Sequence, residues 1–437
     1  PVKDFWIISG FIVDYIQSLF FLIFGAHWQI YVAHASLVNS LLSVFLLFFF
    51  RLIRLNFFYS IIVCLSFSIL AYPSSGTPFV DHHSSFLSLA SIICLILAIK
   101  KQNKIFWFLI PIFIMLALLS KAVPTAYFIV MIITILTVYT FKKKDFICIK
   151  YLSISSSISF IILIFFLLFN GIDINDFFIQ NFIYPQTIGT ERFENLLNTS
   201  FLRIITQYKF IFLLNIILLV MLLIKKPHKN YHSKEEILIF ISMTLIFIFH
   251  QVLTKNQIFI NFLLPLQIGY ILLFLQEKKN INYLLIFFLL VLTYKYHIRF
   301  NQERKFHELS NVNFSSAIPA SKIDKKLTGL KWITPEYPDK PNIEIQKILS
   351  IKKILEKEEN FILMSNYSFF SVILEKETNT PTRWFTFDGT DFPRGKNKFK
   401  KRYIDLFKRI IKENDINKIF IIKPVTLDEV YNYLDRE

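Results

Sequence analysis

The chain is poor in glycine and cysteine. Its 437 residues include 9 glycines and 3 cysteines. Cys64 and Cys94 fall inside apolar runs and Cys148 opens another, so the sequence offers no disulfide framework for an exterior domain. The polar C-terminal third contains no glycine-rich phosphate loop and no Cys and His at metal-binding spacing. These absences leave disulfide-stabilised, nucleotide-binding and zinc-binding domains without support there.

Acidic residues are also scarce. Lys and Arg number 48 against 31 Asp and Glu, which gives a formal net charge of +17. In a soluble protein this excess would suggest nucleic acid, but hydrophobic residues make up 54% of the chain, and the mean hydropathy is +0.51. Much of the positive charge lies in short gaps between apolar runs, where it can face anionic lipid headgroups. We therefore expect membrane lipids, and no nucleic acid, as partners.

The apolar runs predict a polytopic α-helical membrane protein. A membrane helix needs about 20 mostly apolar residues. On that basis we expect about ten transmembrane helices, near Trp28–Phe50, Phe57–Tyr72, Ser84–Ile99, Ile105–Leu119, Thr125–Phe141, Phe146–Phe169, Tyr208–Ile224, Ile237–Leu253, Ile258–Leu275 and Tyr283–His297.

The gaps between these runs alternate in charge, and this alternation predicts orientation. The basic gaps are Arg51–Arg54, Lys100–Lys104, Lys142–Lys150, Lys225–Lys234 and Lys278–Lys279. Intervening gaps such as Tyr72–Val80 are nearly bare of positive charge. Because basic loops stay in the cytoplasm, the residues after Arg299 are expected outside it.

Two domains are predicted, a transmembrane domain at residues 1–298 and an extracytoplasmic domain at residues 299–437. Residues 1–27 form an outer segment, in which Phe5–Gly25 is expected to be an amphipathic helix on the membrane surface. The chain begins at Pro1, without Met or a signal-peptide pattern, so we expect a further span upstream in the complete protein.

The C-terminal region alternates strand and helix patterns and predicts a small α/β domain. Phe361–Ser365 and Lys418–Ile422 have the composition of short buried strands. Lys396–Asn414 is a charged amphipathic helix, and Leu427–Leu434 is another helix that follows Thr426 as its cap. The residues indicate no chemistry for this domain beyond a lid or an acceptor-docking module.

The sharpest polar cluster is Asp81-His82-His83, where an outer loop enters a span. Ionisable groups at a water–lipid boundary are costly unless they are paired or functional. Asp81, His82 and His83 are therefore candidate catalytic residues, and Asp81 with His82 is a candidate divalent-metal ligand set. The structural alternative is a helix cap at Asp81 with two packed histidines.

Outer cations form the second group of candidates. Lys121 lies in a short turn at an otherwise uncharged outer gap, and Lys255 and Arg192 lie in two other outer loops. Lys3 precedes Asp4, a further candidate catalytic carboxylate, at the start of the amphipathic segment. Each cation suits a phosphate group, and each also has a structural alternative as an anchor in the lipid headgroups. Together they favour transfer of a group from a lipid-borne phosphate donor.

Two segments resemble a known class. Lys3-Asp4-Phe5-Trp6 through Ile23-Phe24-Gly25, and the run Pro78-Phe79-Val80-Asp81-His82-His83, resemble outer segments of the GT-C membrane glycosyltransferases. That class includes the protein O-mannosyltransferases and the aminoarabinose transferases of lipid A.

The resemblance implies a polyprenyl-phosphate sugar donor and a glycan, lipid or protein acceptor. It also implies action outside the cytoplasm, in a multi-pass protein of the bacterial inner membrane with a periplasmic C-terminal domain. In that class an acidic residue of the first outer loop is the usual base, and here this residue is expected upstream of Pro1, with Asp4 as its neighbour.

Two other classes of function stay open. One is a membrane transporter or lipid flippase, although the predicted spans hold only mildly polar residues such as His34, Asn39 and Asn215, and no repeat is evident. The other is a non-catalytic membrane scaffold with an exterior binding domain.

Overall fold

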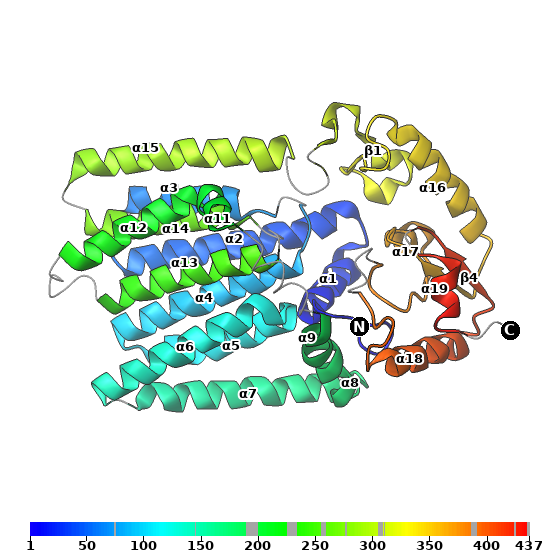
Figure 1. Ribbon diagram of the computed structural model, residues 1–437, viewed down its shortest axis with the longest axis horizontal. Helices are drawn as coiled ribbons and strands as arrows, with labels where there is room; N and C mark the ends of the chain where they lie inside the picture. The colour runs from blue at the N-terminus through cyan, green and yellow to red at the C-terminus, as the bar shows by residue number, and fades with distance from the viewer. Residues whose placement is uncertain are drawn as a thin grey trace. The chain divides into compact units, whose positions relative to one another are not determined.

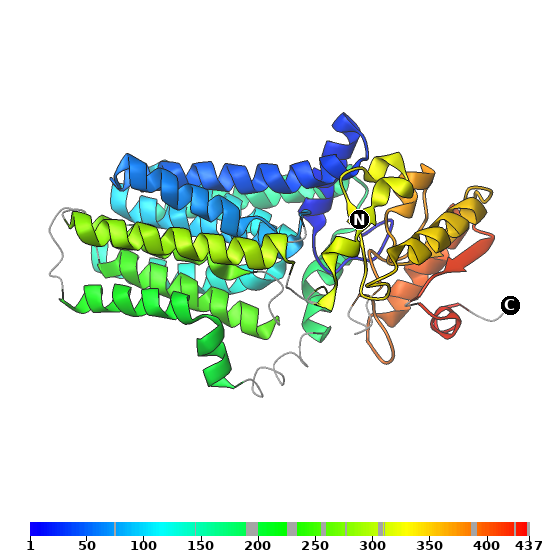
Figure 2. The ribbon, with the colours of Figure 1, turned by 90° about the horizontal axis from the view of Figure 1, so that it is seen from above.

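The structure is a computed structural model and is mainly helical (Figures 1 and 2). It describes residues 1–73, 76–144, 146–188, 200–224, 234–254, 259–275, 278–304, 309, 311–385, 391–423 and 425–434. The chain divides into two compact units. One comprises Val32–Ile162 and Glu191–Arg304, and the other comprises Pro1–Tyr31, Leu163–Thr190 and Lys305–Glu437.

The first of these, which we call the bundle, consists mainly of long apolar helices that run roughly along one common axis in both views (Figures 1 and 2). The exception is the short helix Phe201–Gln207, which is bent by 86° from the helix that follows it. Its helices are α2 (Trp28–Leu52), α3 (Phe57–Ala71), α4 (Val80–Lys101), α5 (Lys104–Ser120), α6 (Ala122–Lys143), α7 (Ile147–Phe169), α11 (Phe201–Gln207), α12 (Lys209–Ile224), α13 (Lys234–Leu253), α14 (Leu263–Phe274) and α15 (Lys279–Tyr296). Short π and 3₁₀ segments extend α15 at His297–Gln302 and precede α14 at Ile260–Phe262.

The helices of the bundle coincide with the apolar runs of the sequence. Within the described residues, six are long and apolar enough to cross a membrane, or seven if the bent pair α11 and α12 is one span. The other apolar helices, α3, α5 and the segment Ile260–Phe274, are shorter. The prediction of a polytopic helical membrane protein is therefore supported.

Helix α4 is the centre of the bundle, because its residues are almost all buried from Val80 to Ala98. It packs most extensively against α5 and also contacts α6 and α13. Close approach elsewhere depends on a small residue. A Cβ atom at Gly269 of α14 would lie 2.6 Å from the Phe50 ring of α2, so that crossing requires glycine.

The other unit, which we call the mixed unit, combines helices with two small sheets. Its helices are α1 (Phe11–Phe24), α8 (Ile174–Phe178), α9 (Tyr184–Ile188), α16 (Pro341–Leu355), α17 (Phe370–Leu374), α18 (Lys400–Glu413) and α19 (Leu427–Tyr431), with a π-helical segment at Ile179–Ile183. Strands β1 (Ile318–Pro319) and β2 (Lys331–Trp332) pair antiparallel, and β3 (Phe361–Met364) and β4 (Lys418–Ile421) pair in parallel with Phe361 opposite Lys418.

The C-terminal elements lie close to their predicted positions. Strands β3 and β4 match the two predicted strands in position, but only β3 is buried as predicted, since β4 is half-buried and begins with the exposed Lys418. Helix α18 falls within the predicted amphipathic helix. Its apolar face packs into the core through Tyr403 and Phe407, while its basic residues stay outside. Helix α19 opens with a capping box, in which Thr426 accepts from the Glu429 amide, as its sequence predicts.

The N-terminal prediction is wrong in part. Helix α1 begins at Phe11, not at Phe5, because Gly10 with φ of 89° ends the preceding extended segment. In that segment Trp6 forms a parallel bridge to Thr382, and its backbone amide donates to the Pro381 carbonyl at 2.9 Å. The segment between the predicted spans Phe146–Phe169 and Tyr208–Ile224, Asn170–Gln207, contains helices α8, α9 and α11, and residues 189–199 within it lie outside the described residues.

An ion pair inside the mixed unit makes its stability dependent on pH. Arg383 contacts the Asp14 carboxylate at 2.6 Å and donates to the Ser9 carbonyl at 2.9 Å. Burial raises the pKa of Asp14 above its usual value of 3.8, and the Arg383 charge opposes that shift. A carboxyl with a raised folded-state pKa contributes stability below its unfolded pKa, and this contribution is lost as pH rises through the folded pKa.

Arg383→Met should therefore reduce stability at neutral pH by about 1.5–3 kcal/mol and have a much smaller effect near pH 3. The measurement is the melting temperature across an acidic-to-neutral pH series, with the exposed Lys401→Met as control. Parallel curves for Arg383→Met and wild type would contradict this role for the pair.

Candidate functional site

Three ionisable residues from different helices meet at one end of the bundle. Asp81 is the second residue of α4, Lys121 connects α5 to α6, and His250 lies in the last turn of α13. Helices α4 and α6 start at this end and α13 finishes there. At the opposite end, Lys100 of α4 and Lys142 of α6 pair with Glu236 and Glu235 of α13.

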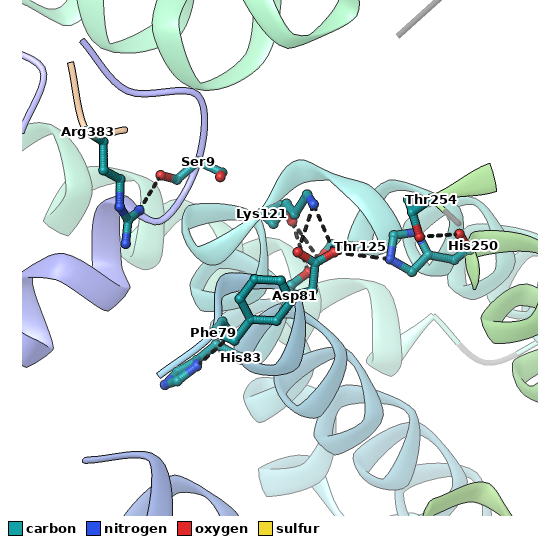
Figure 3. A network of polar contacts seen from close by, with 10 residues as sticks. Ser9, Phe79, Asp81, His83, Lys121, Thr125, His250, Thr254 and Arg383 are labelled. Carbon is teal, nitrogen blue, oxygen red and sulfur yellow. Dashed lines mark hydrogen bonds and ion pairs between the residues drawn. The ribbon is translucent and has the colours of Figure 1, made fainter. Parts of the chain in front are cut away.

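Lys121 and His250 both contact the Asp81 carboxylate (Figure 3). The Lys121 ammonium lies 2.8 Å from each carboxylate oxygen, and His250 Nε2 lies 3.4 Å from Oδ1. The side chains of Asp81 and His250 are 1% and 0% exposed, whereas that of Lys121 is 18% exposed. Lys121 is thus the member of this trio with the greatest access to an incoming ligand.

Hydroxyl groups fix the backbone around Lys121. Ser84, one turn after Asp81, donates to the Lys121 carbonyl at 3.0 Å, and its oxygen lies 2.8 Å from the Thr125 hydroxyl. The Lys121 amide donates to the Ala117 carbonyl at 2.9 Å and so caps α5. On the far side of the trio, the Thr254 hydroxyl donates to the His250 carbonyl at 2.7 Å (Figure 3). The Ser84 contact thus ties the Lys121 backbone to α4, and the Thr254 contact satisfies a carbonyl in the last turn of α13.

His83 makes a separate contact one turn away. Its Nδ1 lies 3.0 Å from the Phe79 carbonyl, and its Nε2 lies 3.2 Å from Nε2 of His34 on α2. Since a carbonyl only accepts, His83 Nδ1 carries a proton, and in a neutral His83 ring Nε2 then accepts from Nε2–H of His34. This arrangement matches a neutral histidine pair that links α2 to α4.

His82 points into an aromatic environment, with ring centroids 5.7 Å from Phe79 and 5.6 Å from Phe86. Its Nδ1 is buried and has no hydrogen-bond partner within the part of the chain that the structure describes. Among the described residues, no group of three or more His, Cys, Asp or Glu is placed to hold a metal ion. The described residues therefore provide no third ligand beside Asp81 and His82, and metal binding by these two residues stays a prediction.

The other sequence candidates divide into two sets. Lys3 and Asp4 are exposed residues of the mixed unit, and Asp4 lies 3.7 Å from the N-terminal amine. Arg192 and Lys255 lie outside the described residues. Sequence reasoning missed His250, although an ionisable residue at the end of an apolar run was a usable signal.

The trio places a fixed cation beside a carboxylate in a region of low dielectric. Both charges are costly to bury alone, and each offsets the other at this distance. A lysine ammonium binds phosphate as a point charge, and a carboxylate can take a proton from a hydroxyl. The arrangement can therefore combine anion binding with general base chemistry.

Comparisons with family models, curated proteins and solved structures found no match for this chain.

Proposed function

We propose that this chain is a membrane glycosyltransferase of the GT-C type, which transfers a sugar from a polyprenyl-phosphate donor to an acceptor outside the cytoplasm. The observation that carries the proposal is the Asp81–Lys121 pair at the end of the bundle opposite the basic residues Lys100 and Lys142. By the positive-inside rule, that end faces away from the cytoplasm. The phosphate of a lipid-linked donor lies at the level of the outer headgroups, which is where we place this end of the bundle.

In the proposed reaction, the donor phosphate replaces the Asp81 carboxylate as the partner of the Lys121 ammonium. The released carboxylate then accepts the proton of the acceptor hydroxyl as its oxygen attacks the anomeric carbon. The bond between that carbon and the phosphate oxygen breaks, and the polyprenyl phosphate leaves with its charge beside Lys121. Donor binding and activation of the base are thereby coupled through one ion pair.

We also propose the finer topology that this reaction requires. The six long helices, the pair α11 and α12, and the shorter α3, α5 and Ile260–Phe274 would make ten spans. The polar residues after Arg299 would form an α/β domain in the periplasm of a bacterial cell, where a glycan, lipid or protein acceptor is available.

A transporter is the second candidate, and one observation favours it. The bundle interior holds a buried polar cluster, because the Asn215 side-chain oxygen accepts from Thr244 and Gln267. Polar groups inside a membrane often mark substrate or ion pathways. The Asp81 trio, however, lies at helix ends, whereas coupled transporters bind their substrates near the membrane midplane.

Sugar transfer from a polyprenyl-phosphate donor in membranes tests the transferase proposal. Lys121→Ala should reduce transfer by roughly ten- to a hundredfold, the loss expected for one charged contact of about 1.5–3 kcal/mol. Asp81→Asn should abolish transfer, since an amide cannot accept the proton. Lys143→Ala, an exposed residue at the basic end of α6, is the matched control and should not change the rate. Full activity in both site variants would contradict the proposal.

A further inference from the structure

The mixed unit contains a cavity of about 420 Å³ beside α18. Its lining includes Arg402, Asp405 and Arg409 from α18, Asp176 from α8, and Trp6 from the N-terminal segment. The volume lies in the range of small-molecule sites, about 300–1,000 Å³. Neither the transferase nor the transporter candidate uses these residues.

The charged groups of this cavity balance one another. Arg402 contacts Asp176 at 2.6 Å, and Arg409 donates to the Lys3 carbonyl at 2.7 Å. Asp405, on the same helix between the two arginines, is exposed and lines the cavity. Two guanidinium groups and two carboxylates therefore face the space, with no net charge.

Two buried polar residues form the floor. Trp6 is 2% exposed, and its Nε1–H has no hydrogen-bond partner among the described residues. Edge-to-face contacts with Tyr184 and Tyr403, at 5.4 and 5.9 Å, fix its ring. Gln180 is 3% exposed, accepts from the Ile7 amide and donates to the Val2 carbonyl. These contacts hold the floor of the cavity in one conformation.

We propose that this cavity binds a neutral saccharide ring. Sugar hydroxyls both donate and accept, which suits a lining that sets guanidinium donors beside carboxylate acceptors. A phosphate would face Asp176 and Asp405, and a metal ion or amine would face Arg402 and Arg409, so a charged ligand meets a like charge in either case. Leu406 and Val2 supply an apolar wall for the C–H groups of a sugar.

This inference does not depend on the transferase proposal, because it requires binding and no transfer. The test measures the dissociation constants of glucose, galactose and N-acetylglucosamine by titration of the full-length protein. The protein is held in nanodiscs that contain no sugar-headed detergent. Inorganic phosphate and glucose 1-phosphate are the charged comparators. At least one neutral sugar should bind saturably, and more tightly than either comparator.

Asp405→Asn and Trp6→Phe should each weaken that binding, by roughly tenfold for the charged group and less for the indole. Glu413→Gln, an exposed carboxylate at the end of the same helix and outside the lining, is the control and should bind as wild type does. Because Asp405 is exposed, Asp405→Asn should fold normally even if Trp6→Phe does not. Absence of saturable sugar binding, tighter binding of phosphate, or binding unchanged in Asp405→Asn would overturn the proposal.

Discussion

Replacing Lys121 with methionine is expected to lower the free energy of unfolding by about 3–5 kcal/mol. The substitution removes the ammonium that lies 2.8 Å from both oxygens of Asp81, whose side chain is 1% exposed. A carboxylate at this depth keeps its desolvation cost when its partner is lost. Methionine preserves the length and the apolar stem of lysine, so the loss reports the charge and not a cavity.

The double variant Lys121→Met with Asp81→Asn distinguishes this explanation from a packing defect. With both charges removed, no ion remains uncompensated, and stability should return to within about 1–2 kcal/mol of wild type. The measurement is reversible unfolding of the full chain in mixed micelles. A double variant that is as unstable as Lys121→Met would show that the ion pair does not account for the loss.

The second large effect is expected at the other end of the bundle. Glu236, 3% exposed, contacts Lys100 at 3.2 Å and accepts from the Tyr270 hydroxyl at 2.7 Å. Lys100→Met should cost about 3 kcal/mol, because a buried carboxylate loses a counter-charge. Glu236→Gln should cost less, roughly 1–2 kcal/mol, because the amide oxygen can still accept from Tyr270 and the Lys100 ammonium can extend toward water.

The neighbouring pair Lys142–Glu235 is a matched control, since it lies at the same end of the bundle and also contacts α13, but its side chains are 65% and 49% exposed. An exposed pair is worth about 0–1 kcal/mol, so Lys142→Met should barely change the unfolding midpoint. Equal losses for Lys100→Met and Lys142→Met would contradict the argument that burial makes the Lys100–Glu236 pair important.

The helices of the bundle were predictable because each apolar run exceeds or approaches membrane length and each gap is polar. The start of α1 was not, since the apolar pattern runs unbroken through Ile7 and Ile8 and only the backbone at Gly10 ends the extended segment. Likewise, the apolar residues of Asn170–Gln207 gave no sign of the packing that makes α8 and α9 helical and buries Phe177 and Tyr184. Tertiary contacts decide such short helices, and periodicity does not.

Two of the three residues of the candidate site, Asp81 and Lys121, were predictable, but their contacts were not. Asp81 is a carboxylate where an outer loop enters a span, and Lys121 is a cation in an otherwise uncharged outer gap, yet nothing local indicates that residues 40 positions apart form one ion pair. His250 was missed, and nothing in the sequence indicates the pairing of His83 with His34. The contact of Trp6 with Thr382 could not be predicted either, because it joins residues that lie far apart in the sequence.

The most direct test of the central claim uses sealed vesicles that contain the purified full-length protein, a polyprenyl-phosphate sugar donor labelled in the sugar, and an acceptor on the outer face. We expect labelled acceptor with wild type, none with Asp81→Asn, and no accumulation of free sugar or donor inside the vesicles. Labelled solute inside the vesicles, with no labelled acceptor for any donor, would contradict the transferase and support the transporter.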